Sequence, residues 1–445
     1  MSGQWVRSRG LSWLDADGKK ILLARSLRTF AYGYLAVILA LYLEQLGLHP
    51  VQVGIVLTAA IAGSAGMTIG WSLLADRYGR RRTVTTMSLL MVLGGLLFAF
   101  AHSFWLLLLG SFTGTISATS SEVGAFLTVE QAMLPQTASD AKRTWLFALY
   151  DMLGNFAGAA GALCAGSVGV FGSLGLSGAA AYRPLLLTYA LIGLLNLLIF
   201  RRLSDKVELA KVEGRRRFIG IHRSAGTVVK LSLLFGLDAF AGGFVVQSLV
   251  AYWFHLRWGL SPQTLGLIFF WVGVLSGLSL VAAGWLAQRI GLLKTMVLTH
   301  LPSNLLLMLV PLAPSAPLAV AAFLARMSIS QMDVPTRRSY SMAVVDPDER
   351  TATAGITNVA RGTVSALSPI LSGVAFGLAA LGLPFYLAGG LKIVYDLLIY
   401  KTFRNVRPPE EEARAGEGLA PPNGDSLTGG SLCKTLRITR MTLWR

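Results

Sequence analysis

Ionisable side chains stand inside long apolar stretches of this sequence, where a charge is removed from water. Such residues are expensive to bury, so they are candidates for carrying a proton or for binding a charged solute. The acidic candidates are Glu122, Asp151, Asp238 and Asp333, and the basic ones are Arg28, Arg326 and Arg361. Polar side chains of the same stretches that could line a cavity are Tyr150, Asn155 and Gln247.

The spacing of these charges leaves two interpretations open. Arg326 and Asp333 are seven residues apart and share one helix face, so they either face a cavity or form a buried structural ion pair. A rise of about 1.5 Å per residue places Arg326 and Arg361 near the middle of their apolar stretches. Lys392 and Asp396 are four residues apart and are expected to pair within one helix.

Apolar helices that cross a membrane must position these residues. Hydrophobic residues make up 54% of the 445 residues and charged ones 14%, against about a quarter in soluble proteins. Each apolar stretch of about 20 residues can span a bilayer as a helix. We predict twelve spans, at residues 29–46, 52–74, 84–101, 104–127, 144–166, 184–200, 231–255, 263–286, 296–313, 316–335, 352–380 and 383–400.

Basic residues alternate between the loops. The joins after even-numbered spans are rich in Lys and Arg, whereas the opposite joins hold only Arg183 and Arg257. This asymmetry predicts that both termini and the central loop are cytoplasmic. The net charge of +17 therefore lies in short loops and not on a nucleic-acid-binding face.

An internal duplication divides the chain into two halves. The segment 47–54 (GLHPVQVG) matches 259–266 (GLSPQTLG), Asp151 falls on Asn358 at an offset of 207, and 196–203 (NLLIFRRL) resembles 396–403 (DLLIYKTF). Related halves of this kind pack as two similar bundles. We therefore predict a cytoplasmic N-terminal segment at 1–28, a six-helix bundle at 29–200, a basic cytoplasmic linker at 201–230, a second six-helix bundle at 231–403 and a disordered cytoplasmic tail at 404–445.

The loop after the second span has a specific motif. Residues 72–82 read SLLADRYGRRR, which resembles the G-x-L-A-D-R-x-G-R-R/K signature of the major facilitator superfamily, with Ser72 in place of the leading glycine. In that family the aspartate meets the N-terminal end of a helix in the other half, and nearby arginines help to close the cytoplasmic side. The resemblance implies a conformational latch here of Asp76, Arg77, Gly79, Arg80, Glu130, Arg143, Gln288, Arg289 and Arg350. The second copy carries Gln288 where the first has Asp76.

The fifth span carries the stripe Gly154-x-x-x-Gly158-x-x-Gly161, which permits close packing of helices. Antiporters of the family have a related pattern with a proline where this chain has Ala159. The stripe indicates tight packing more than it indicates drug antiport.

The resemblance implies an all-α membrane protein with twelve transmembrane helices in two pseudo-symmetric bundles, the major facilitator fold. It also implies a secondary transporter that works by alternating access, and we expect proton-coupled efflux of a small molecule. One alternative is proton-coupled uptake of an organic anion or metabolite, and another is a membrane sensor or scaffold that has lost transport. We expect a monomer in the plasma (cell inner) membrane whose partners are its solute, protons and the bilayer.

An enzyme is not indicated. The sequence has no P-loop, dinucleotide-binding glycine turn, HExxH or GxSxG motif, and its two cysteines show no metal-ligand spacing. We expect no cofactor and no metal.

Overall fold

The computed structural model describes residues 13–120, 125–139, 142–208, 222–346 and 349–404. These residues form helices joined by turns, with no strand among them, so the predicted all-α fold is confirmed. The predicted tail at 404–445, apart from its first residue, and residues 209–221 of the predicted linker lie outside the described residues.

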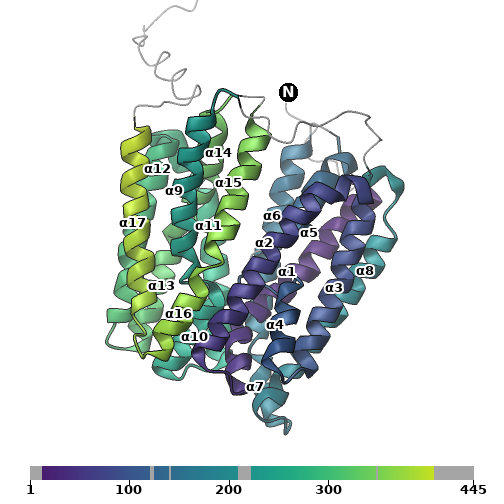
Figure 1. Ribbon diagram of the computed structural model, residues 1–445, viewed down its shortest axis with the longest axis vertical. Helices are drawn as coiled ribbons and strands as arrows, with labels where there is room; N and C mark the ends of the chain where they lie inside the picture. Colours follow the sequence, from purple (N-terminus) through teal and green to yellow (C-terminus); the bar gives the residue numbers. More distant parts are fainter. Residues whose placement is uncertain (1–12, 121–124, 140–141, 209–221, 347–348, 405–445) are drawn as a thin grey trace, which may run out of the picture. The chain divides into compact units, whose positions relative to one another are not determined.

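Figure 1 shows the helices of the two halves, which follow one another along the chain. Those of the first half are α1 (Ala16–Gln45), α2 (Pro50–Tyr78), α3 (Arg80–Phe100), α4 (Phe104–Phe112), α5 (Ala125–Met133), α6 (Arg143–Cys164), α7 (Ser167–Ser173) and α8 (Arg183–Arg201). Those of the second half are α9 (Ala225–Gly243), α10 (Gln247–Trp258), α11 (Pro262–Ile290), α12 (Leu292–Leu309), α13 (Ala316–Ser330), α14 (Asp333–Ala343), α15 (Arg350–Ser365), α16 (Ser368–Gly377) and α17 (Leu383–Phe403).

Ten spans in the described part of the chain are long and apolar enough to cross a membrane. The predicted spans 104–127 and 316–335 are each replaced by two shorter helices, α4 with α5 and α13 with α14. Pro335 explains the second break, because its ring would clash with the carbonyl group of residue 331 in a continuous helix. In the first break Gly114 adopts a φ of +68°, which favours glycine and ends α4.

The first span also begins earlier than predicted. Helix α1 starts at Ala16, inside the segment 1–28 that we predicted to be a cytoplasmic extension. Asp15 explains this start, because its carboxylate accepts a 2.7 Å hydrogen bond from the Gly18 N–H group and caps the helix.

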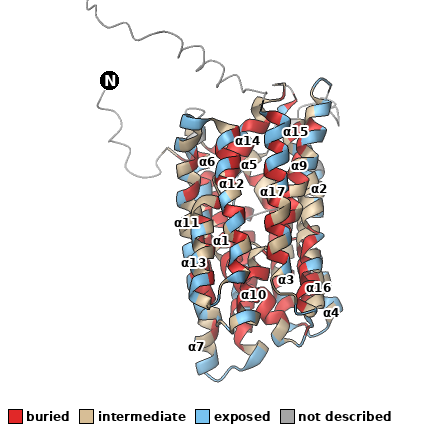
Figure 2. Ribbon diagram, turned by 90° about the vertical axis from the view of Figure 1, so that its left-hand side faces the viewer, coloured by how far each residue is buried: buried red, intermediate tan, exposed pale blue. Residues whose placement is uncertain are grey.

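The outward faces of the helices are apolar. Large apolar side chains are widely exposed, among them Val281 at 79%, Trp105 at 73% and Leu233 at 70%. Figure 2 shows buried residues where the helices meet and exposed ones along outer faces such as those of α11 and α13. Exposed apolar surface on this scale suits contact with lipid and not with water.

Small residues bring α1 and α6 into close contact. A side-chain carbon added at Gly33 would overlap the carbonyl oxygen of Gly158, and one added at Gly161 would overlap that of Phe30. The glycine stripe of the fifth span thus packs directly on the first span, as its spacing indicates.

The two halves contact each other near the ends of helices remote from the start of α1. A carbon added at Gly54 of α2 would lie 3.0 Å from Cα of Gly373 in α16, and the Ser248 hydroxyl donates a 2.9 Å hydrogen bond to the carbonyl of Ala36. These contacts lie on the side that the loop charges predict to face away from the cytoplasm.

A carboxylate anchors the start of the second half. Glu349, just before α15, accepts hydrogen bonds from the backbone N–H groups of Arg223 at 2.7 Å, Ser224 at 2.9 Å and also His222, directly before α9. The N–H groups of Arg223 and then His222 lower the pKa of Glu349 from 4.5 to about 2. This contact ties the loop before α15 to the first turn of α9.

Replacing the Glu349 carboxylate should weaken its contact with the residues before α9, by an amount that depends on pH. A lowered pKa in the folded state contributes stability above the unfolded-state pKa of 4.5 and loses it as the pH falls towards 2. We expect Glu349→Gln to lower the thermal unfolding midpoint of the detergent-solubilised protein at pH 7, and the difference from the wild type to shrink below pH 4.5. A difference that stayed constant down to pH 3 would contradict the ionised contact.

Candidate functional site

A buried ion pair joins three helices of the first half. The Arg28 guanidinium of α1 lies 2.8 Å from the Glu130 carboxylate of α5, and both side chains are 0% exposed. The Tyr150 hydroxyl of α6 donates a 2.8 Å hydrogen bond to the same carboxylate oxygen. The Arg28 guanidinium also stacks 4.1 Å from the centre of the Phe126 ring.

A larger charge network joins four helices of the second half. The buried carboxylate of Asp238 in α9 is contacted by Lys392 of α17 at 2.5 Å, Arg337 of α14 at 2.9 Å and Arg361 of α15 at 3.1 Å. Arg337 also binds the Asp333 carboxylate one turn earlier in α14, at 2.7 Å. Arg337 therefore bridges two buried carboxylates.

The two networks occupy matching positions with their charges exchanged. The segment LRTFA at 27–31 aligns with LDAFA at 237–241, which places Arg28 opposite Asp238. An offset of 207 residues places Glu130 opposite Arg337, and the same offset relates the first residues of α6 and α15. Each half thus holds one cross-helix ion pair at the same place, but with opposite polarity.

The second network carries an excess of positive charge. Among the described residues, Arg337, Arg361 and Lys392 form ion pairs with two carboxylates, Asp238 and Asp333, while Asp396 lies close enough to Lys392 to interact with it electrostatically. Arg326 of α13 adds a further cation that makes no carboxylate ion pair with any described residue. Its Nη1 lies 3.0 Å from the Met327 sulfur, and its Nε is buried without a hydrogen-bond partner among the described residues.

The structure brings together Asp238, Asp333 and Arg361, three of the predicted solute and proton candidates. Arg326 is close enough to Asp333 and Asp238 to interact electrostatically with both. Tyr150 belongs instead to the network of the first half.

The remaining candidates are placed elsewhere. Asp151 is half exposed and lies 3.4 Å from Arg25, and Asn155 is exposed on α6. Gln247 begins α10, and its amide nitrogen is buried without a partner among the described residues. Glu122 lies outside the described residues.

The predicted latch is only partly described. The side chains of Asp76 and Arg77 lie outside the described residues. Gly79 joins α2 to α3 with a φ of +103°, where any other residue would be strained. The Arg80 N–H group donates a 2.8 Å hydrogen bond to Glu208, and its guanidinium donates one of 2.8 Å to the carbonyl of Ala132.

Glu130 lies fully buried one turn before the end of α5, paired with Arg28. The remaining predicted latch residues lie exposed at helix ends, namely Arg143, Gln288, Arg289 and Arg350. Their latch role stays a prediction.

The expected pairing of Lys392 with Asp396 is wrong. Lys392 reaches across to Asp238, and Asp396 instead contacts His300 at 2.8 Å and the Asn304 amide at 3.0 Å, both from α12. Spacing within one helix permits a pair, but packing between α17 and its neighbours offers closer partners to both side chains.

The sequence did not predict which helices contribute side chains to each network. Arg25, His300 and Arg337 were not among the residues predicted from the sequence. The offset of 207 residues, already visible in the repeat, would have paired Glu130 with Arg337 and shown the exchange of charge. The described residues hold no group of His, Cys, Asp and Glu suited to a metal ion.

The chain belongs to the Major Facilitator Superfamily, whose model matches residues 21–257 and 231–441. The protein is therefore a membrane transporter of a small molecule and not an enzyme. A relative is an uncharacterized membrane protein of Saccharomyces cerevisiae, YJR124C, which is 24% identical over 424 residues and covers 88% of this chain and 94% of the yeast protein.

Solved structures of transporters share the fold. The nucleoside transporter NupG has a TM-score of 0.69 at 12% identity, and the match covers 88% of this chain and 100% of the NupG chain. A bacterial homolog of the human lysosomal transporter Spinster, inward-facing and unoccupied, has a TM-score of 0.67 at 16% identity, covering 87% of this chain and 95% of its own.

Exchanging the charges of the first network tests whether the two networks are equivalent. Removing one partner of a buried ion pair costs about 3–5 kcal/mol, so Arg28→Asp and Glu130→Arg should each lower the thermal unfolding midpoint sharply. The double variant adopts the polarity already present at Asp238 and Arg337, and should recover much of the loss.

A misplaced cation provides the control for this exchange. Arg28→Asp combined with Asp151→Arg puts the new arginine at a half-exposed position and should recover nothing. The two networks are not equivalent if the unfolding midpoint recovers equally in both double variants, or if it recovers in neither of them.

Proposed function

We propose that this transporter carries a small organic anion by alternating access, coupled to protons. The observation that carries the proposal is the buried positive excess of the second half. Four cations, Arg326, Arg337, Arg361 and Lys392, lie with the carboxylates of Asp238 and Asp333 and near that of Asp396, and the Arg326 guanidinium has no carboxylate partner among the described residues.

An uncompensated charge inside a membrane protein is unfavourable, and a bound counter-ion removes the penalty. A carboxylate or phosphate group suits a guanidinium because it accepts two parallel hydrogen bonds. Arg326 and the partly exposed Arg361, whose side chain is 26% exposed, are the residues that we assign to this group.

The charge balance disfavours a cationic solute. Each buried carboxylate of the second network already contacts an arginine or lysine. A cationic solute would have to displace one of these partners and would add to the positive excess. The alternative of organic-anion transport therefore fits the site better.

We propose uptake of the anion together with protons, because the membrane potential opposes the entry of a negative charge. Moving one negative charge into a cell with a negative interior costs about 2.3 kcal/mol per 100 mV. Uptake of an anion against this potential requires a co-transported cation, and a proton is the simplest one. Asp396, buried against His300 and Asn304 beside the network, is the carboxylate that we assign as a candidate proton carrier.

Flux measurements on Arg326→Gln test the proposal. The purified protein in proteoliposomes, with acid outside and the potential clamped, should accumulate a member of a panel of labelled organic carboxylates and phosphate esters. Hydrogen bonds to a charged group contribute about 1.5–3 kcal/mol, so the variant should raise KM for the anion about tenfold or more.

Arg257→Gln is the matched control, because Arg257 is exposed at the end of α10 and lies outside the network. Its flux should equal that of the wild type. The proposal fails if the wild type carries organic cations but no anion, or if Arg326→Gln leaves the KM for the anion unchanged. A protein without flux of any solute would favour the sensor or scaffold alternative.

A further inference from the structure

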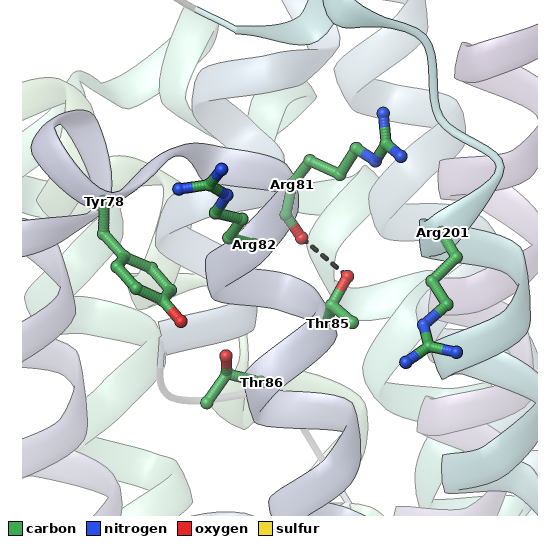
Figure 3. A pocket seen from close by; sticks show the side chains of 6 residues that line it. All are labelled: Tyr78, Arg81, Arg82, Thr85, Thr86 and Arg201. Atoms are coloured by element: carbon green, nitrogen blue, oxygen red, sulfur yellow. Dashed lines mark hydrogen bonds between the residues drawn. The ribbon is translucent and has the colours of Figure 1, made fainter.

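A pocket rich in arginine lies between the start of α3 and the end of α8, away from both charge networks. Its volume is about 240 Å³, and Figure 3 shows the six side chains that line it. They are Tyr78, Arg81, Arg82, Thr85, Thr86 and Arg201. The loop charges predict that this end of α3 and α8 is at the cytoplasmic face of the membrane.

The positive charges of this pocket have few carboxylate partners among the described residues. Arg82 and Arg201 are exposed, and neither forms an ion pair with a described carboxylate. Arg81 has one loose contact, at 3.4 Å, with an Asp205 side chain that is 95% exposed. The nearby Glu208 is already engaged by the backbone N–H groups of Arg80 at 2.8 Å and Arg81 at 3.0 Å.

The polar groups of the pocket are mainly hydrogen-bond donors. Three guanidinium groups and the hydroxyls of Tyr78 and Thr86 can donate, whereas the Thr85 hydroxyl donates to the carbonyl of Arg81 at 2.7 Å, as Figure 3 shows. A phosphate group has several acceptor oxygens and matches such a set of donors.

An exposed apolar face continues from the pocket along both helices. On α3, Leu89, Leu93 and Leu96 follow Thr85 at helical spacing and are 48%, 46% and 38% exposed. Residues three or four apart lie on one side of a helix, so these leucines extend the face of the pocket.

Helix α8 has a similar row of exposed leucines, which runs from Arg201 back towards the start of the helix. Counting back from Arg201, Leu198, Leu194 and Leu191 are 47%, 43% and 54% exposed. The two helices pack on each other, with Gly95 of α3 against Tyr189 of α8. The pocket therefore stands at the end of a two-helix apolar surface.

We infer that this pocket binds the phosphate of an anionic phospholipid, with the acyl chains lying on the leucine face of α3 and α8. A phosphate with two attached hydrocarbon chains is the ligand that uses both features. Inorganic phosphate or a soluble phosphate ester would use the arginines alone and leave the adjoining leucines without a role.

The second half does not repeat the donor residues of this pocket, so a general requirement for basic loops does not explain them. At the offset of 212 residues that relates Gly79 to Gly291, the positions of Tyr78, Arg81, Thr85 and Thr86 are taken by Ile290, Leu293, Val297 and Leu298. Arg82 keeps a basic counterpart in Lys294, and Arg201 falls on Lys401 in the repeat of 196–203 with 396–403. The donor set is thus specific to the first half.

Lipid retention by the purified full-length protein tests this assignment. Delipidated protein in detergent is titrated with phosphatidylglycerol, phosphatidylcholine or inorganic phosphate, and bound ligand is measured by native mass spectrometry. A basic side chain contributes about 1 kcal/mol at an anionic surface, so Arg82→Gln and Arg201→Gln should each weaken phosphatidylglycerol binding about fivefold, and the double variant about thirtyfold.

Lys294→Gln is the matched control, since it removes one positive charge at the equivalent place of the second half. It should leave phosphatidylglycerol retention unchanged, and equal unfolding midpoints without lipid should confirm that all variants are folded. The inference is overturned if the arginine variants retain as much phosphatidylglycerol as the wild type. It is also overturned if phosphatidylcholine binds equally, if Lys294→Gln has the same effect, or if inorganic phosphate binds as tightly as the lipid.

Discussion

The carboxylate of Asp238 is the point on which the second half depends. It is buried in α9 and held by cations from α14, α15 and α17 at 2.5–3.1 Å. A buried charge is tolerated only when it is paired and hydrogen-bonded, so these four helices are placed by the requirement to keep it paired. The first half meets the same requirement with one arginine, one glutamate and one tyrosine, shared by α1, α5 and α6.

The two halves are unequal in charge because the second network adds Arg361 and Lys392 to its ion pair. Among the described residues, the first network pairs one cation with one carboxylate, whereas the second holds three cations and two carboxylates, with Arg326 and Asp396 beside it. An anionic solute would balance the positive surplus of the second network. In a proton-coupled cycle, the net charge of this network would change as the solute binds and is released. The lipid-facing arginine pocket of α3 and α8 is separate from this surplus and concerns the surface of the first half.

Apolar stretches and loop charges predicted the all-α membrane fold, because hydropathy and the positive-inside bias act along the chain and not between helices. The repeat and the motif around Asp76 identified the family. The helix breaks in the fourth and tenth predicted spans were not foreseen, although Pro335 marks one of them. Partners of buried charges were the least predictable feature. Lys392 and Asp396 have the spacing of a pair within one helix, yet each binds another helix, since packing decides which partner is nearer.

The thermal unfolding midpoint of the unmodified protein, measured with matched solutes, tests the central claim most directly. A panel would compare small carboxylates and phosphate esters with amides and amines of the same carbon skeleton. A ligand that binds only the folded state at about 100 times its Kd stabilises it by about 2.7 kcal/mol. Our account predicts that at least one anion raises the midpoint while its amide and amine counterparts do not. Stabilisation by amines but not by any anion would contradict it.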